Sequence, residues 1–130
     1  MIVLDASVVV ELLLRTPDAL ALEERVFGAG TPLHVPHLVD VEVAQVLRRY
    51  ALRGDISGAR GATALTLLGQ FPLARHAHAP LAARVWALRA NLTAYDAVYV
   101  ALAEGLGATL LTRDASLARA PGVQAQVEVV

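Results

Sequence analysis

The chain has 130 residues, a length that fits one hydrophobic core and predicts a single domain over residues 1–130. Apolar residues make up 56% of it, which excludes intrinsic disorder, and no uncharged stretch reaches the roughly 18 to 20 residues that span a bilayer. The absence of cysteine excludes disulfides and thiolate sites, and the absence of lysine excludes every lysine-dependent mechanism. Because the net charge is only -1, any contact with nucleic acid is restricted to a local patch.

Short apolar segments and helical segments alternate along the whole chain. The predicted strands cover residues 2–4, 33–35, 73–75, 109–112 and 127–130. The predicted helices cover residues 6–14, 17–27, 36–53, 57–71, 80–90 and 93–106, followed by a short helix from Ala115. Apolar strands that alternate with helices are typical of a parallel sheet covered on both faces. We therefore predict an α/β fold, a three-layer α/β/α sandwich around a central, mostly parallel sheet.

Two aspartates follow predicted strands at the same edge of this sheet. Asp5 comes directly after the first strand, and Asp114 stands two residues after the strand over residues 109–112. Ligands of open α/β sheets collect beyond the carboxyl ends of the strands, so we expect these carboxylates to converge at a site. Each aspartate also precedes a predicted helix, and helix capping is the alternative interpretation for both.

A third acid, Glu42, interrupts an apolar face of the long predicted helix. Val39, Val43 and Val46 share that face at helical spacing, and no arginine lies three or four residues from Glu42 to neutralise it. Asp40 lies about 200° away around the helix and cannot share its task. We predict that Asp40 is solvated.

Asp96 is the fourth candidate, on a helix that is apolar almost all round and is therefore predicted to be buried. Its neighbours three and four residues away are uncharged. The alternative is a capping box in which Thr93 caps the helix and Asp96 replaces the usual glutamate.

Four converging acids require a counter-charge. A buried, unpaired carboxylate costs several kcal/mol unless it is protonated or finds a cation, and neighbouring carboxylates repel one another. A hard divalent cation satisfies both needs, and oxygen ligands without cysteine favour Mg²⁺ or Mn²⁺. This chemistry is typical of a phosphoryl-transfer site.

The segments that carry these acids resemble the PIN-domain ribonucleases. They are residues 3–7 (VLDAS), 36–47 (PHLVDVEVAQVL), 93–103 (TAYDAVYVALA) and 111–114 (LTRD). The resemblance spans nearly the whole chain, and a stand-alone domain of this size looks like the VapC toxin of a VapBC toxin-antitoxin pair. It implies a PIN-like fold and an endoribonuclease that cleaves RNA with a metal-activated water, so inhibiting translation or growth.

The resemblance also implies roles for individual residues. The metal would be surrounded by four catalytic acids, Asp5, Glu42, Asp96 and Asp114. Ser7 and Thr112 would orient carboxylates or water, although both could as easily be turn or capping groups. Some relatives carry a further acid just after the fourth, where this chain has Ala115 and Ser116, so we expect one firmly held ion.

Arginine is the residue expected to meet RNA phosphates, because its planar guanidinium offers a fork of donors. The candidates flank the acidic segments: Arg15, Arg48, Arg49, Arg53 and Arg113. For each of them the alternative is a solvated helix surface.

Partner proteins are expected for two reasons. The first predicted helix is ringed by Val8, Val9, Leu12, Leu13 and Leu14, more than one buried stripe requires, so part of this surface is expected to face a partner. The resemblance implies a homodimer and a VapB-type antitoxin, whose apolar helix packs near the first helices and whose chain obstructs the acidic pocket. The N-terminus lacks the features of a secretory signal, so we expect a cytoplasmic protein without membrane contact.

The sequence also allows four alternative interpretations. His34, His37, His76 and His78 could be drawn as a zinc site, but Pro36 breaks the helical register of the first pair and no third ligand completes the pattern. Receiver domains and haloacid-dehalogenase-type phosphatases both use a lysine that this chain lacks, and the latter need an aspartate where Ser7 stands. A non-catalytic PIN-fold module that binds RNA or protein with metal remains the alternative function.

Overall fold

The first strand of the chain lies at the centre of the sheet. In the computed structural model, which describes residues 1–130, the strands are β1 Ile2–Leu4, β2 Leu33–Pro36, β3 Leu73–His76, β4 Thr109–Thr112 and β5 Val127–Val129. Their order is β3-β2-β1-β4-β5, and every neighbouring pair is parallel. The sheet is therefore entirely parallel, and all five carboxyl ends lie at one edge.

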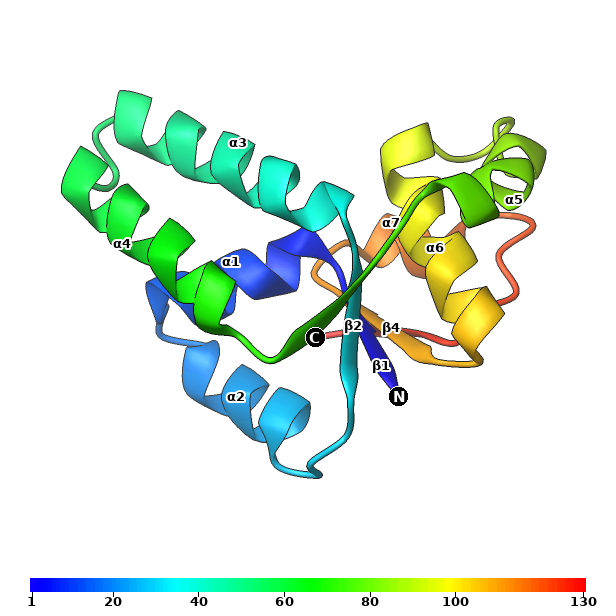
Figure 1. Ribbon diagram of the computed structural model, residues 1–130, viewed down its shortest axis with the longest axis horizontal. Helices are drawn as coiled ribbons and strands as arrows, with labels where there is room; N and C mark the ends of the chain where they lie inside the picture. The colour runs from blue at the N-terminus through cyan, green and yellow to red at the C-terminus, as the bar shows by residue number, and fades with distance from the viewer.

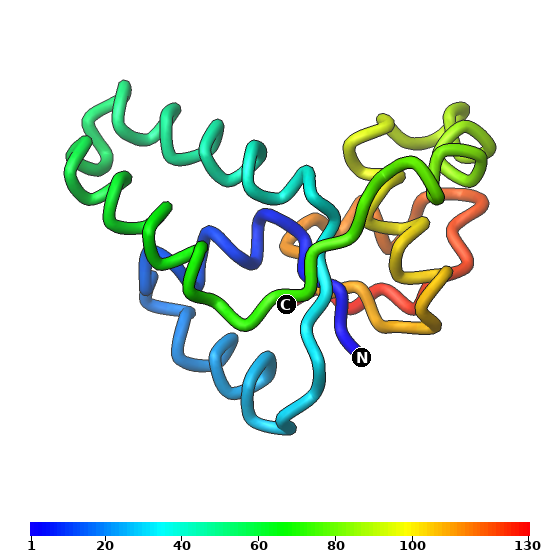
Figure 2. Tube along the Cα trace, viewed as in Figure 1, coloured from blue at the N-terminus to red at the C-terminus, as the bar shows by residue number.

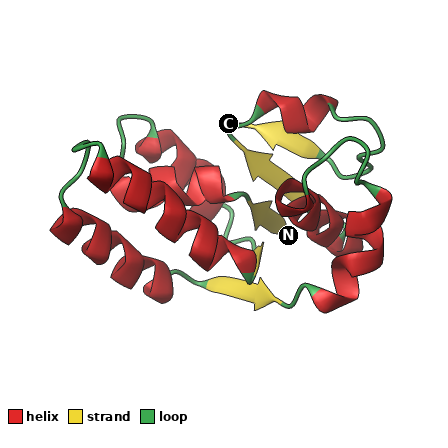
Figure 3. Ribbon diagram, turned by 90° about the horizontal axis from the view of Figure 1, so that it is seen from above, coloured by secondary structure: helices red, strands yellow, loops and turns green.

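Helices cover both faces of the sheet. They are α1 Ala6–Leu14, α2 Ala19–Phe27, α3 Leu38–Leu52, α4 Gly58–Gln70, α5 Ala82–Ala87, α6 Ala94–Leu106 and α7 Ala115–Arg119, with a 3-10 turn η1 at Ala79–Leu81. Helices α1 to α4 lie on one side of the strands and α5 to α7 on the other (Figures 1 and 3). The predicted three-layer α/β/α sandwich is thus confirmed. No helix has the length and apolar character that a membrane crossing requires.

Three helices differ from their predicted limits. The helix predicted over residues 17–27 begins at Ala19. The helix predicted from Pro36 begins at Leu38, because Pro36 still pairs with His76 at the end of β2. The helix predicted over residues 80–90 is divided into η1 and the short α5, after which the chain turns and Leu88 enters the core.

Helix α1 is enclosed by the rest of the chain. Val8, Val9, Leu12 and Leu13 are each at most 2% exposed, and Leu14 packs against the same core. This burial arises because α2, α3, α4 and β4 all contact α1. The expectation that α1 leaves apolar surface for a partner is therefore wrong, since other elements of the same chain cover it.

Two adjacent central strands, β1 and β4, end at the same edge of the sheet. β1 and β4 pair in parallel along their length, with Leu4 opposite Leu111. The trace then leaves β1 into α1 and leaves β4 toward α7 at the same end of the sheet (Figure 2). Residues that immediately follow these strands therefore lie next to each other.

Candidate active site

Four elements bring the predicted acids together. Asp5 follows β1 and Asp114 follows β4, and the Asp5 N–H donates to the carbonyl of Leu111 at 3.0 Å. Glu42 lies in the second turn of α3, and Asp96 lies in the first turn of α6. Burial is the largest cause that raises the pKa values of Glu42 and Asp96, and the negative charge of Asp5 raises both further. The acids therefore form one electrostatically coupled cluster.

Two hydroxyl groups hold the carboxylate of Asp5. The Ser7 hydroxyl donates to Asp5 Oδ2 at 2.9 Å, and the buried Thr112 hydroxyl donates to the same oxygen at 2.7 Å. Each hydroxyl also accepts a backbone N–H, that of Arg113 on Ser7 and that of Asp114 on Thr112. Asp5 stands at the N-cap position of α1 but makes no side-chain capping bond. Its carboxylate is therefore oriented by hydroxyls, and capping does not explain it.

Glu42 is the acid least satisfied by the protein. Its Oε1 is buried without a hydrogen-bond partner. Burial, followed by the charges of Asp5 and Asp96, raises its pKa to about 7. The charged form of this group is therefore disfavoured, and it has no counter-charge in the protein.

Tyr99 is a member of the cluster that sequence reasoning did not single out. Its hydroxyl is buried without a hydrogen-bond partner, and burial and then the charge of Glu42 raise its pKa. The hydroxyl lies near enough to Glu42 to lower the carboxyl pKa, yet the pair does not reach hydrogen-bond geometry. The available signal was its position on α6, three residues after Asp96 and hence on the same helix face.

Asp114 also serves as a helix cap, whereas Asp96 only donates its backbone N–H to the cap residue Thr93. The Thr93 hydroxyl accepts the N–H of Asp96 at 3.1 Å, so the backbone half of the predicted capping box forms. Asp114 caps α7 by accepting the N–H of Ser116 at 2.9 Å and its hydroxyl at 2.7 Å, bonds that lower the Asp114 pKa. The Asp114 charge still raises the pKa of Asp96, after burial and Asp5. Capping and membership of the cluster therefore coexist.

The donor set fits a hydrated divalent cation. No three His, Asp or Glu side chains converge closely enough to enclose an ion by themselves. Mg²⁺ usually takes only one or two carboxylates and keeps several waters, so it needs no such cage. The unpartnered Oε1 of Glu42 and the mutual repulsion of the acids are what a bound cation would relieve. The residues present thus fit the Mg²⁺ or Mn²⁺ expected from the sequence.

Asp40 is not merely solvated as predicted. The Arg75 guanidinium donates to both of its carboxylate oxygens at 2.9 Å, across from β3 to α3. Asp40 does lie on a different face of α3 from Glu42, as its spacing required. The correction arises because Arg75 is distant in the sequence, so periodicity along the helix cannot detect it.

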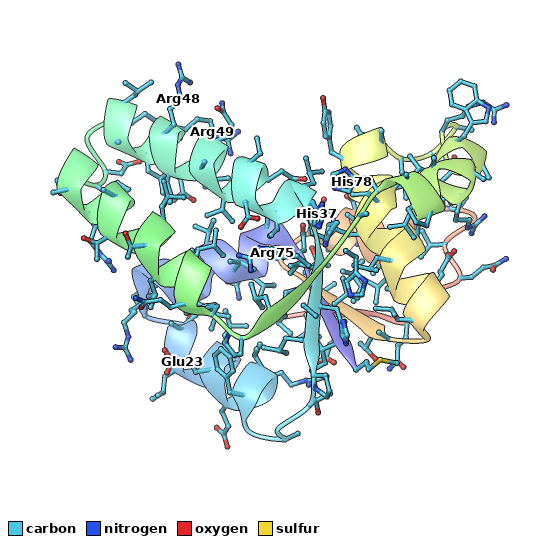
Figure 4. The ribbon with its side chains drawn as sticks, viewed as in Figure 1. Glu23, His37, Arg48, Arg49, Arg75 and His78 are labelled. Atoms are coloured by element: carbon cyan, nitrogen blue, oxygen red, sulfur yellow. The ribbon has the colours of Figure 1, made fainter.

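The predicted RNA-binding arginines differ in how they are engaged. Arg15 pairs with Glu23 and Arg53 with Asp55, both at the surface. Arg113 lies near Glu11 and Asp18 and donates to the carbonyl of Val130, so it ties the site loop to neighbouring elements. Arg48 and Arg49 are exposed and have no ion pair or hydrogen bond; they project from α3 on the side away from α4 (Figure 4).

The four histidines form two cross-strand pairs. His34 Nδ1 and His76 Nε2 are 2.9 Å apart, and the rings of His37 and His78 are 6.0 Å apart. His78 Nε2 accepts the N–H of Leu38, which leaves that nitrogen unavailable to a metal. With no third ligand near either pair, the structure offers no zinc site.

Comparison with known proteins identifies relatives of the whole chain. Residues 2–123 match the PIN domain. Over all 130 residues the chain is 43% identical to ribonuclease VapC9 of Mycobacterium tuberculosis and covers 98% of that protein. Ribonuclease VapC12 of the same organism is 41% identical over 130 residues, with 100% of this chain and 99% of that protein covered.

A solved structure supports the fold. The structure of VapBC2 from Rickettsia felis, bound to a DNA fragment from its promoter, superposes with a TM-score of 0.73 at 16% identity. The superposition covers 99% of this chain and 98% of that one. At this identity the likeness concerns the fold alone.

Proposed function

Because the chain belongs to the PIN-domain family of VapC ribonucleases, we propose that it is a Mg²⁺- or Mn²⁺-dependent endoribonuclease. It acts as the toxin of a type II toxin-antitoxin pair and thereby inhibits translation or growth. The observation that carries this proposal is the electrostatic coupling of Glu42 to Asp5 and Asp96, and of Asp96 to Asp114, together with a Glu42 oxygen that has no partner in the protein. A purely structural cluster would be expected to pair these charges.

Asp5, Glu42, Asp96 and Asp114 would hold the metal together with its water ligands, some of them only through those waters. When bound, such an ion activates water and neutralises charge on the phosphate. Ser7 and Thr112 fix Asp5 through Oδ2 and leave Oδ1 free of protein donors. Burial and the charges of Asp5 and Asp96 disfavour the charged form of Glu42, so this carboxylate would gain from such an ion. Hydrolysis breaks the bond between phosphorus and O3′, so the products carry a 5′-phosphate and a 3′-hydroxyl.

The substrate class we propose is single-stranded or looped RNA. Proteins that recognise specific RNA sequences mostly bind unpaired loops and ends, whose phosphates can approach the acids without a duplex partner in the way. The test is incubation of total RNA with the protein in Mg²⁺ or Mn²⁺, followed by mapping of new 5′-phosphate ends. Excess EDTA should abolish the new ends, and cleavage that persists undiminished in EDTA contradicts the metal mechanism. RNA binding without any cleavage would instead favour the non-catalytic module.

A VapB-type antitoxin and a homodimer are the proposed protein partners. Since α1 is covered, the surface available to a second copy lies elsewhere, and the apolar groove between α3, α5 and α6 supports this role. The groove includes Leu38, Val85, Trp86 and Tyr95, of which Trp86 is 68% exposed. A cationic antitoxin side chain that reaches the acids would replace the metal charge and explain inhibition.

Light scattering tests both partners. The protein alone should have the mass of a dimer, and Trp86→Glu should convert it to a monomer. Leu20→Glu is the matched control, because Leu20 is 78% exposed on α2, away from the groove. Addition of the protein encoded by the neighbouring reading frame should give a larger complex. A strict monomer that ignores this protein contradicts both proposals.

A further inference from the structure

The face of α3 that carries Glu42 carries arginines further along the helix. An α-helix turns 100° per residue, so Arg49, seven residues after Glu42, lies within about 20° of it and about 10.5 Å further along the axis. Arg53 lies within about 20° of Glu42 on the other side, another turn away. Arg48 is rotated by about 120° from Glu42. One face of α3 thus leads from the acidic cluster to Arg49 and Arg53.

Arg49 is free to bind an anion. Its side chain is exposed, with no carboxylate or carbonyl partner in the structure. Arg53 is held by Asp55 at 3.1 Å and stacks on Tyr50, but both members of this ion pair are more than half exposed. Exposed pairs of this kind contribute about 0 to 1 kcal/mol, so a phosphate can compete for Arg53.

The other arginines near the site are already committed. Arg75 holds Asp40 through two bonds, and Arg113 is held by acidic side chains and by the Val130 carbonyl. A strand of RNA that enters the acidic cluster meets repulsion there, so its neighbouring phosphates need a cation outside the cluster. Among the candidate arginines, Arg49 meets that need, because it lies on the Glu42 face of α3 and has no ion-pair partner.

We propose that Arg49 binds a backbone phosphate of the RNA strand about three nucleotides away from the one that is cleaved, and that the strand continues along α3 toward Arg53. This inference rests on the proposed ribonuclease function. The rise of about 10.5 Å from Glu42 to Arg49 corresponds to about three stacked nucleotides at about 3.4 Å each. The parallel N–H groups of the guanidinium suit bidentate binding of a phosphate. An arginine that is only solvated makes no use of this geometry.

The experiment compares two adjacent arginines. Fluorescence anisotropy with a short labelled single-stranded RNA, in Mg²⁺ and in the cleavage-deficient Asp96→Asn background, measures the dissociation constant as a function of salt. Arg49→Ala should weaken binding about tenfold and lower the slope of log affinity against log salt by about 0.7. Arg48→Ala removes the same charge from the neighbouring position and should change affinity by less than about twofold. Arg49→Lys should restore part of the affinity, because the charge returns without the fork.

Each outcome has a definite meaning. Equal losses in Arg48→Ala and Arg49→Ala overturn the inference, because then only diffuse charge matters. Unchanged RNA binding with a weakened antitoxin complex in Arg49→Ala also overturns it and assigns the arginine to a protein contact. If the wild-type protein cleaves RNA while Arg49→Ala binds it normally, only this inference fails. If the wild-type protein neither binds nor cleaves RNA, the proposed function fails and this inference falls with it.

Discussion

Two carboxylates on helix α3, only two residues apart, have opposite environments. Asp40 faces β3, where Arg75 donates to both of its oxygens. Glu42 faces the cluster with Asp5 and Asp96, where both charged neighbours have the same sign and one of its oxygens has no donor. The fold therefore has the means to neutralise an acid on this helix, and it does so on one face only.

The difference teaches where to look for function. A structural acid is paired or exposed, because an uncompensated buried charge costs stability. An acid left uncompensated among other acids is stabilised only by protonation or by a cation that the chain does not contain. The Asp40 side of α3 thus has the features of a structural ion pair, and the Glu42 side has those expected of the proposed metal site.

The largest contrast is expected in RNA cleavage. Asp5→Asn, Asp96→Asn, Asp114→Asn and Glu42→Gln should each lower kcat/KM by about a thousandfold or more, because each removes ligand charge at the reacting phosphate. Asp40→Asn should keep kcat/KM within about twofold, since its charge acts at Arg75. Circular dichroism should show that all five variants stay folded. If two or more acid variants lose their fold, the cluster is structural and the comparison collapses.

A smaller loss of activity is expected from the hydroxyls that hold Asp5. Ser7→Ala and Thr112→Val should each reduce kcat/KM by about ten- to a hundredfold, because groups that orient a metal ligand typically contribute that much. Thr63→Val is a suitable control: Thr63 is exposed on α4, and its hydroxyl only donates to the carbonyl of Ala59. Equal activity of all three variants would show that Asp5 needs no orienting partner.

The stability of the metal-free protein should depend on pH through Glu42. Its pKa is raised from 4.5 to about 7 in the fold, so the charged form is disfavoured there. Stability from this group is fully present below about pH 4.5 and falls as the pH rises toward 7. At pH 8 in EDTA, Glu42→Gln should therefore stabilise the protein by about 2 kcal/mol after allowance for partial solvent exposure, and at pH 4 it should have no effect. Urea unfolding at both pH values measures this, and a destabilised variant at pH 8 refutes it.

The opposite sign, and the smallest effect, is expected on the Asp40 side. Asp40→Asn should destabilise the protein by about 0.5 to 1 kcal/mol, because the side chains of the pair are 44% and 27% exposed and solvent weakens their attraction. Salt should reduce the effect. A double-mutant cycle with Arg75→Gln isolates the pair. If Asp40→Asn stabilises the protein as Glu42→Gln does, the two faces of α3 do not differ as we describe.

Much of the fold was predictable because its signals are local. The apolar strands mark their elements directly, and so do the helix caps. The structure places Ser57 at the start of α4, Thr93 at the start of α6 and Gly107 at the end of α6. The position of Glu42 was equally visible, as an acid in an apolar stripe. The start of α3 was less so, because Pro36 suits the first turn of a helix as well as the end of a strand.

The rest depended on contacts between distant residues. The Arg75 partner of Asp40 comes from β3, and the covers of α1 come from three helices and a strand. The interaction between the buried Tyr99 hydroxyl and Glu42 depends on how α6 packs in the fold, which the sequence of the helix alone does not indicate. Periodicity within one helix indicates which face a residue occupies, but it does not indicate which other elements that face contacts.

Binding of Mn²⁺ tests the central claim most directly, because it needs neither RNA nor an antitoxin. Electron paramagnetic resonance of free Mn²⁺ in a titration with the purified protein measures the bound ion. We predict that the wild-type protein and Asp40→Asn each bind one ion, and that Glu42→Gln and Asp96→Asn bind it much more weakly. If the wild-type protein binds no Mn²⁺, or if all four proteins bind it equally, the acids of this cluster do not form the metal site.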